Sequence, residues 1–194
     1  MEPVDAIPYP GERPPAPGRL RLVQRFVNTV DYEHGREMLH SPDRLKALLV
    51  ALGLLPAGAR VTAADLRHAH EVREALRALA LANNRGRGRS RAGGDALGVL
   101  ERAAAGGLVV RFDERGTSIL EPAATGVRGA FAALVGIVHT ASADGTWPRL
   151  KACSRDVCGW LFYDRSRNRS ARWCQMAVCG NRTKTRAYRA RRAS

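Results

Sequence analysis

Cysteine is absent from the first 152 residues of this 194-residue chain, and its five histidines are scattered. The sequence contains neither a Ser/His/Asp set nor a glycine-rich phosphate loop, so it lacks the usual signatures of an enzyme. The first residues lack the basic start and apolar run of a signal peptide, and no stretch approaches the roughly 20 apolar residues of a membrane span. We therefore expect a cytoplasmic protein that is neither an enzyme nor embedded in a membrane.

All four cysteines lie in the last 42 residues, as two pairs with four residues inside each pair: Cys153, Cys158, Cys174 and Cys179. This spacing suits two short turns that hold one zinc ion tetrahedrally, with each sulfur about 2.3 Å from the metal. Two disulfides are the alternative, but disulfides belong to oxidising compartments and nothing in the sequence indicates export. The sequence thus predicts one structural Zn²⁺ with the four cysteines as ligands. Four protein ligands also close the site to catalysis.

Positive charge is concentrated at the C-terminal end. Of the net charge of +14, residues 149–194 contribute +11 and residues 1–148 only +3. A preference of the source genome for arginine would raise the total, but it would not gather the excess in one quarter of the chain. Four thiolates and Zn²⁺ would together remove two positive charges and leave about +9. Localised positive charge is typical of proteins that bind a polyanion.

The residues after Cys179 are good helix formers, and this helix is expected to carry much of the charge. Arg182, Arg186 and Arg189 would share one face, and we expect Lys184 on its flank. A solvated basic face without a partner is the plainer interpretation. We expect eight residues to contact nucleic acid, four in the turn after Tyr163 and four in the helix: Arg165, Arg167, Arg169, Arg172, Arg182, Lys184, Arg186 and Arg189.

The rest of the chain predicts an α+β protein with a mainly helical N-terminal domain. Residues 1–18 hold six of the ten prolines and are expected to form a disordered leader. The domain would span 19–145 and contain a β-hairpin of 108–112 and 117–121. Its helices are expected at 20–31, from Pro42 to near Gly53, from Thr62 to 82, at 96–105 and at 122–142.

Residues 146–194 are expected to form the small zinc module, a hairpin followed by the basic helix. Residues 160–163 would be one strand and residues 172–173 its return. Such a short segment buries too little apolar surface to fold unaided, so zinc must supply part of its stability. Five side chains are expected to pack around the metal: Trp160, Phe162, Trp173, Met176 and Tyr188.

Two other features have open interpretations. The Arg-Gly segment at 85–91 is a solvated connector between helices or an auxiliary arm that grips phosphates. Asn28, Asp31 and His34 form local hydrogen bonds or line a small pocket of the N-terminal domain.

Two motifs carry a family resemblance. The stretch from Cys158 to Arg182, ending in Cys179-Gly180-Asn181-Arg182, resembles the CGNR zinc finger family of bacteria. Residues 26–31 and 41–45 resemble the start of the ABATE domain that usually precedes this finger. The resemblance is most specific over 153–192. It implies a bacterial transcription regulator linked to stress responses, with the four cysteines as metal ligands and a zinc-ribbon-like module for DNA.

We therefore expect a zinc-dependent DNA-binding protein that regulates transcription. The alternative is an RNA- or ribosome-associated zinc module, because a basic patch does not distinguish DNA from RNA. A homodimer and a small-molecule ligand of the N-terminal domain are further interactions that the sequence permits.

Overall fold

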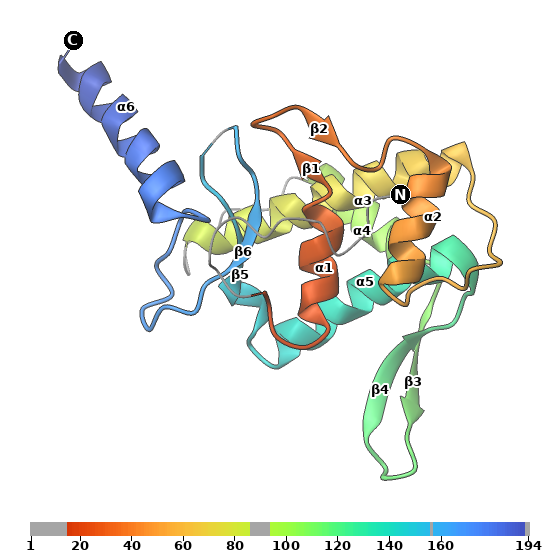
Figure 1. Cartoon of the computed structure of the whole chain (residues 1–194). Coiled ribbons are helices and arrows are strands. Elements are labelled where there is room, and N and C mark those ends of the chain that lie inside the picture. Colours follow the sequence, from red (N-terminus) through yellow and green to blue (C-terminus); the bar gives the residue numbers. More distant parts are fainter. Residues whose placement is uncertain (1–14, 86–93, 156, 193–194) are drawn as a thin grey trace.

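The computed structural model describes residues 15–85, 94–155 and 157–192 (Figure 1). Most of the predicted leader and of the Arg-Gly segment therefore lies outside the described residues. The predicted α+β class is confirmed, because five helices and small antiparallel hairpins precede the cysteines. The helices are α1 (Leu20–Val27), α2 (Pro42–Ala51), α3 (Ala63–Ala82), α4 (Gly94–Ala104) and α5 (Gly126–Ala143).

The predicted helix starts are confirmed by their caps. The Ser41 hydroxyl accepts a hydrogen bond from the Arg44 amide at 3.3 Å, and Pro42 occupies the first turn of α2. Thr62 and Asp65 form a reciprocal capping box at the start of α3, in which each side chain accepts from the other residue's amide. Local sequence chemistry therefore determines where these two helices begin.

Two predicted helix boundaries are wrong. The first helix ends at Val27 rather than Asp31, because Val30–Asp31 form β1 and pair with β2 (Arg36–Glu37). The last helix of the domain begins at Gly126 rather than Pro122, because Pro122 pairs with Leu108 in a hairpin. In both cases, strand pairing with another segment prevails over the local helical pattern.

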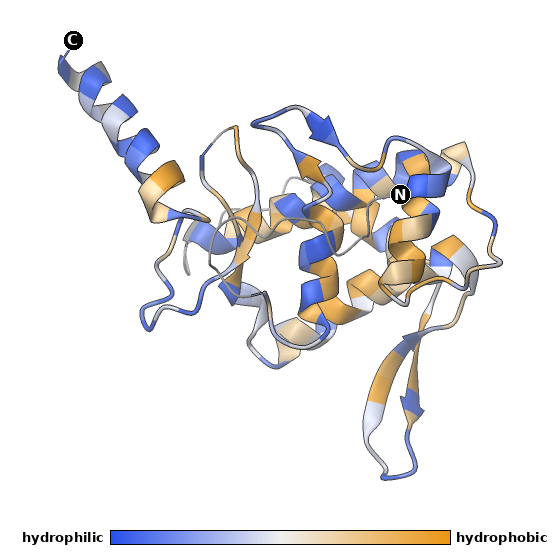
Figure 2. Cartoon of the chain, in the orientation of Figure 1, coloured by the Kyte–Doolittle hydropathy of each residue, from blue (hydrophilic) through white to orange (hydrophobic). Residues whose placement is uncertain are grey.

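The core of the domain lies between α1, α3, α4 and α5 (Figure 1). The rings of Phe26 and Phe131 pack with their centroids 6.3 Å apart, and both side chains are buried. The hairpin of β3 (Leu108–Phe112) and β4 (Ser118–Pro122) projects from this body with apolar residues on its surface (Figures 1 and 2).

Helix α5 is the one helix of the described residues that is long and apolar enough to cross a membrane by length and composition. However, 56% of its apolar window is buried within the protein. Its contacts are with α1, α3, α4 and the β3–β4 hairpin. This burial is typical of a core helix.

The C-terminal segment continues the same hydrophobic core. A 3₁₀ turn (Trp147–Arg149) leads into β5 (Leu150–Ala152), which pairs antiparallel with β6 (Leu161–Tyr163). The predicted return strand at 172–173 is wrong, because β6 pairs with β5 instead. Leu150 and Leu161 are fully buried in the cluster that contains Phe26, so the core crosses residue 145 without interruption.

Candidate metal centre and basic surface

The four cysteine sulfurs gather at one point. All four Sγ atoms lie within 4.8 Å of one another, and the distances from Cys174 to Cys158 and to Cys179 are both 3.7 Å. A tetrahedral zinc ion with sulfur ligands at about 2.3 Å requires neighbouring sulfurs about 3.8 Å apart. The donor set therefore fits Zn²⁺ in both chemistry and spacing.

Each pair of cysteines is positioned by a turn. Cys153 directly follows β5, and Cys158 precedes Gly159, whose φ of +57° allows the chain to turn into β6. Cys179 lies in a π-helical turn (Met176–Gly180) that runs into α6 (Asn181–Arg192). At Gly180, a β-carbon would collide with the sulfur of Met176.

Without a cation, the four thiols hold each other's protons. Hydrogen bonds from the thiols of Cys158 and Cys174 lower the pKa of Cys153 to about 2. The Cys153 sulfur raises the pKa of Cys158 to about 12, and it also raises that of Cys174. Sulfurs this close cannot all ionise unless a positive charge lies between them. The four cysteines hold one structural Zn²⁺, which supplies that charge and cross-links the two turns.

Side chains of the N-terminal domain form hydrogen bonds with the backbone of the zinc module. The buried Asn28 accepts a hydrogen bond from the Leu161 amide at 2.8 Å and donates one to the Leu161 carbonyl at 2.9 Å. Its amide thus extends the pairing of β6. From α3, Arg77 donates to the carbonyl of Gly159 at 2.5 Å, beside Cys158. The Asn28 backbone amide makes the expected local bond, since it caps α1 by donating to the Gln24 carbonyl at 3.0 Å, but the partner of its side chain lies 133 residues away.

Two asparagines directly after α3 donate further hydrogen bonds to the zinc module. Asn83 donates to the carbonyls of Trp147 and Leu150 at 3.0 and 2.8 Å. Asn84 donates to the carbonyl of Ala152 and to the Ser154 hydroxyl. The only sequence signal for these contacts is a pair of amides at the end of an amphipathic helix.

A buried ion pair shapes the basic turn. We call residues 165–172 the arginine turn. Lys151 and Asp164 are 2% and 0% exposed, and their Nζ and Oδ2 atoms are 2.9 Å apart. The ammonium group also donates to the carbonyls of Arg169 and Ala171, while Asp164 accepts from Ser166 and from the Ala171 amide. The pair therefore links both ends of the arginine turn to β5.

Hydrogen bonding keeps Asp164 ionised in this buried position. Burial by itself would raise the pKa of Asp164, but hydrogen bonds from Ser166 and Lys151 lower it below the ordinary value of 3.8. This pair cannot be read from the sequence, because a lone lysine and a lone aspartate 13 residues apart carry no recognisable pattern.

The arginines of this turn are all exposed, as expected for contacts with a partner. Arg165 stacks over the ring of Tyr163 and donates to the Pro15 carbonyl at 3.1 Å. Arg172 lies over the ring of Trp173. Arg169 has a left-handed backbone with a φ of +50°, and its carbonyl accepts from Lys151.

Helix α6 projects away from the body of the molecule, and its surface is mostly hydrophilic, whereas the preceding turn, Met176–Gly180, is apolar (Figures 1 and 2). Lys184, Arg186 and Arg189 are exposed on it. Arg182 is also exposed but donates to Glu33 of the β1–β2 loop at 2.5 Å. Lys184 was expected at the flank of the face with Arg182, but this is wrong. Two residues further along a helix amount to a rotation of about 200°, which places Lys184 on the side opposite Arg182.

The expected packing around the metal is correct only in part. Trp160 and Phe162 are buried and Trp173 is partly buried, but they join the common core of the chain. Met176 and Tyr188 are 42% and 54% exposed. Because α6 points outward, Tyr188 cannot reach the cysteines and instead packs against Arg192.

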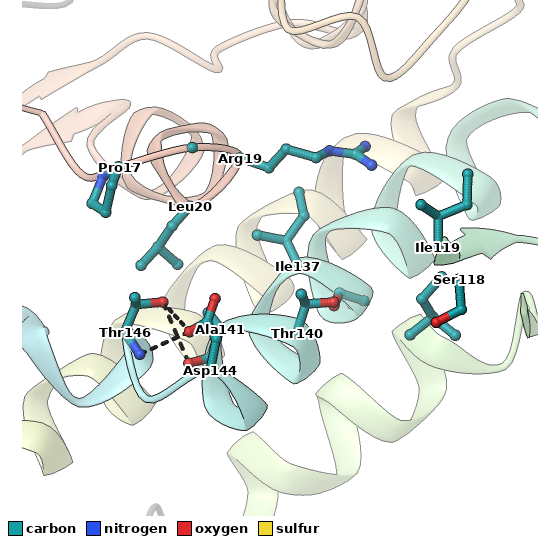
Figure 3. Close-up of a pocket in the computed structure, with 13 residues that line it drawn as sticks. Pro17, Arg19, Leu20, Ser118, Ile119, Ile137, Thr140, Ala141, Asp144 and Thr146 are labelled. Atoms are coloured by element: carbon teal, nitrogen blue, oxygen red, sulfur yellow. Dashed lines mark hydrogen bonds between the residues drawn. The ribbon is translucent and has the colours of Figure 1, made fainter. Parts of the chain in front are cut away.

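A separate pocket, which none of the four cysteines lines, lies between the start of α1, β4 and α5 (Figure 3). Its volume is about 350 Å³, and Leu20, Ile119 and Ile137 supply apolar walls. At its rim, Thr146 donates to the carboxylate of Asp144 from its amide and its hydroxyl. Asp31 and His34 do not line it. They hydrogen-bond each other at 2.7 Å, which is the local arrangement that we expected.

Comparison with known proteins agrees with these features. Residues 149–192 match the family model described as "CGNR zinc finger". Residues 20–143 match the ABATE model, described as "Putative stress-induced transcription regulator". A search of the curated proteins found no match. The family prediction is confirmed: this chain belongs to the ABATE family and carries a CGNR zinc finger at its C-terminal end.

Proposed function

We propose that this protein is a cytoplasmic transcription regulator that binds DNA through α6 and the arginine turn. The observation that carries the proposal is the exposed basic surface beside the zinc site. Helix α6 contains no acidic residue, projects from the body and begins two residues after the zinc ligand Cys179. The family description, a transcription regulator, supports the same function.

The physical argument rests on charge. Arg186 and Arg189 lie on one face of α6, where like charges repel each other in the free protein. DNA phosphates would relieve that repulsion and release condensed counterions. The planar fork of arginine can also bind a phosphate or a guanine edge through two hydrogen bonds. Zinc and the Lys151–Asp164 pair would hold α6 and the arginine turn in fixed positions before DNA binds.

The test compares two double charge reversals that change the net charge equally. In the Arg186→Glu/Arg189→Glu variant, we expect the affinity for a DNA duplex to fall at least about tenfold and the salt slope to fall by about two, as for the loss of two phosphate contacts. The control, Arg60→Glu/Arg115→Glu, alters exposed arginines outside α6 and the arginine turn. Fluorescence anisotropy at several salt concentrations measures both quantities, and metal analysis checks the zinc content.

Equal losses in both variants would refute a contact through α6. The same titration with a structured RNA of equal length tests the alternative function. Tighter binding to that RNA than to the duplex would favour the RNA- or ribosome-associated module.

A further inference from the structure

A single carboxylate of the N-terminal domain holds two arginines of the zinc module. Glu33 Oε2 accepts from Arg155 Nη1 at 2.9 Å, and Glu33 Oε1 accepts from Arg182 Nη1 at 2.5 Å. Arg155 lies inside the first cysteine pair, and its guanidinium also lies 3.9 Å from the sulfur of Cys179. Arg182 is in the first turn of α6. Two cations from separate parts of the finger therefore converge on the two oxygens of one anion.

This arrangement is a site for any anion with two oxygens at carboxylate spacing. Each guanidinium donates through one Nη1 to one oxygen of Glu33, and the two free oxygens of a phosphodiester can accept the same two bonds. The site lies at the base of α6, next to the zinc cluster. A duplex in contact with α6 would bring its phosphates to this position.

We propose that Arg155 and Arg182 form a phosphate site, and that Glu33 occupies it as an internal competitor when no nucleic acid is bound. This inference rests on the proposed function and adds a means of regulation to it. The Glu33 pairs are partly exposed, with side-chain exposure of 27% for Glu33 and 57% for Arg182. Partly exposed ion pairs are weak and screened by salt, so a phosphate can displace the carboxylate.

The loop that carries Glu33 is built to present it. Asp31 Oδ1 accepts from the amides of Glu33 and His34 at 3.1 and 3.2 Å. Gly35, with a φ of +64°, turns the chain back into β2. The same loop connects to Glu37, which forms an ion pair with the buried Arg73 on α3. Displacement of Glu33 would therefore free the β1–β2 loop, which is anchored in the N-terminal domain, from Arg155 and Arg182. Phosphate binding at the two arginines and any change at this loop would then affect each other.

The test compares Glu33→Gln with Glu114→Gln. Both remove one negative charge, but Glu114 lies in the exposed turn of the β3–β4 hairpin. In Glu33→Gln, we expect the affinity for a DNA duplex to rise about three- to tenfold, since phosphates no longer compete with a carboxylate for Arg155 and Arg182. Glu114→Gln should resemble the wild type. Adding Arg155→Gln to the Glu33→Gln variant should remove most of the gain.

Two outcomes would overturn the inference. Equal gains in Glu33→Gln and Glu114→Gln would reduce the effect to net charge. Weaker binding by Glu33→Gln with full zinc content would make Glu33 a brace for α6 instead of a competitor.

A third outcome separates this inference from the proposed function. If neither the wild type nor any variant binds the duplex, the proposed function fails, and inorganic phosphate becomes the probe. NMR signals of the Arg155 and Arg182 side chains should then shift saturably with phosphate in Glu33→Gln and much less in the wild type. Unchanged signals in both proteins would refute the phosphate site.

Discussion

Replacing Lys151 with methionine should unfold the region around the arginine turn. The substitution keeps the unbranched apolar stem, one atom shorter, but leaves the fully buried Asp164 without its ion-pair partner. It also leaves the carbonyls of Arg169 and Ala171 without the donor that they share. Breaking a buried pair by removing one partner costs about 3–5 kcal/mol. That is a large fraction of the roughly 5–15 kcal/mol that stabilise a typical domain.

Urea unfolding at a fixed excess of zinc measures this loss. All three tryptophans lie between 147 and 173, so their fluorescence reports on the zinc module directly. The control is Lys184→Met, the same substitution at an exposed site on α6, which should change the free energy of unfolding by less than about 0.5 kcal/mol. The double variant Lys151→Met/Asp164→Asn should be more stable than Lys151→Met alone, because it contains no unpaired buried carboxylate.

Two results would refute this reasoning. One is a loss below about 1 kcal/mol in Lys151→Met, which is the value expected of an exposed pair. The other is a double variant less stable than Lys151→Met, since the cost would then not come from the unpaired charge.

Three further substitutions test the metal site, the hydrogen bonds between Asn28 and β6, and the ion pair of Glu37 in the N-terminal domain. Cys174→Ser should lose stoichiometric zinc and the ordered fluorescence of the module, because an alcohol does not ionise to bind the metal; metal analysis decides, and full zinc with an unchanged fold would contradict the site. Asn28→Ala should lower the free energy of unfolding by about 1–3 kcal/mol, since the buried Leu161 amide becomes unpaired while its carbonyl keeps only Gln24; an unchanged urea midpoint would show that this contact is not made. Glu37 is also testable by pH. Burial acts to raise the pKa of Glu37, but hydrogen bonds from Arg73 lower it below 4.5 overall. The stability that ionised Glu37 contributes is therefore complete above pH 4.5, and it is lost as the pH falls through the pKa of Glu37 in the folded protein. Glu37→Gln should therefore be less stable than the wild type at neutral pH, and the gap should close in acid; a gap independent of pH would exclude this role.

Much of the local structure follows from short-range chemistry. Ser41, Pro42, Thr62 and Asp65 determine two helix starts through caps that involve only residues three positions apart. The spacing of the cysteines likewise indicates the metal, because each pair needs only a short turn to bring two sulfurs together. Such features can be read from the sequence since the interacting groups are neighbours in the chain.

The misplaced boundaries have the opposite cause. Val30 pairs with a strand that the local pattern does not identify, and Pro122 extends the predicted hairpin by one residue beyond its expected end. The return strand at 172–173 was misplaced for the same reason, because β5 competes successfully for β6. Of these pairs, β5 and β6 are buried in the shared core, whereas β3 and β4 are largely exposed.

By itself, the sequence determined that this chain holds one zinc ion with four cysteines and ends in a basic helix. Both conclusions depend on residue type and spacing within short segments. Only the tertiary structure decided how the finger is held: Asn28 and Arg77 bind its backbone, Lys151 and Asp164 form a buried pair, and Glu33 occupies two of its arginines. Several of these contacts join groups more than 80 residues apart, and their strength comes from burial and geometry that exist only once the chain has folded.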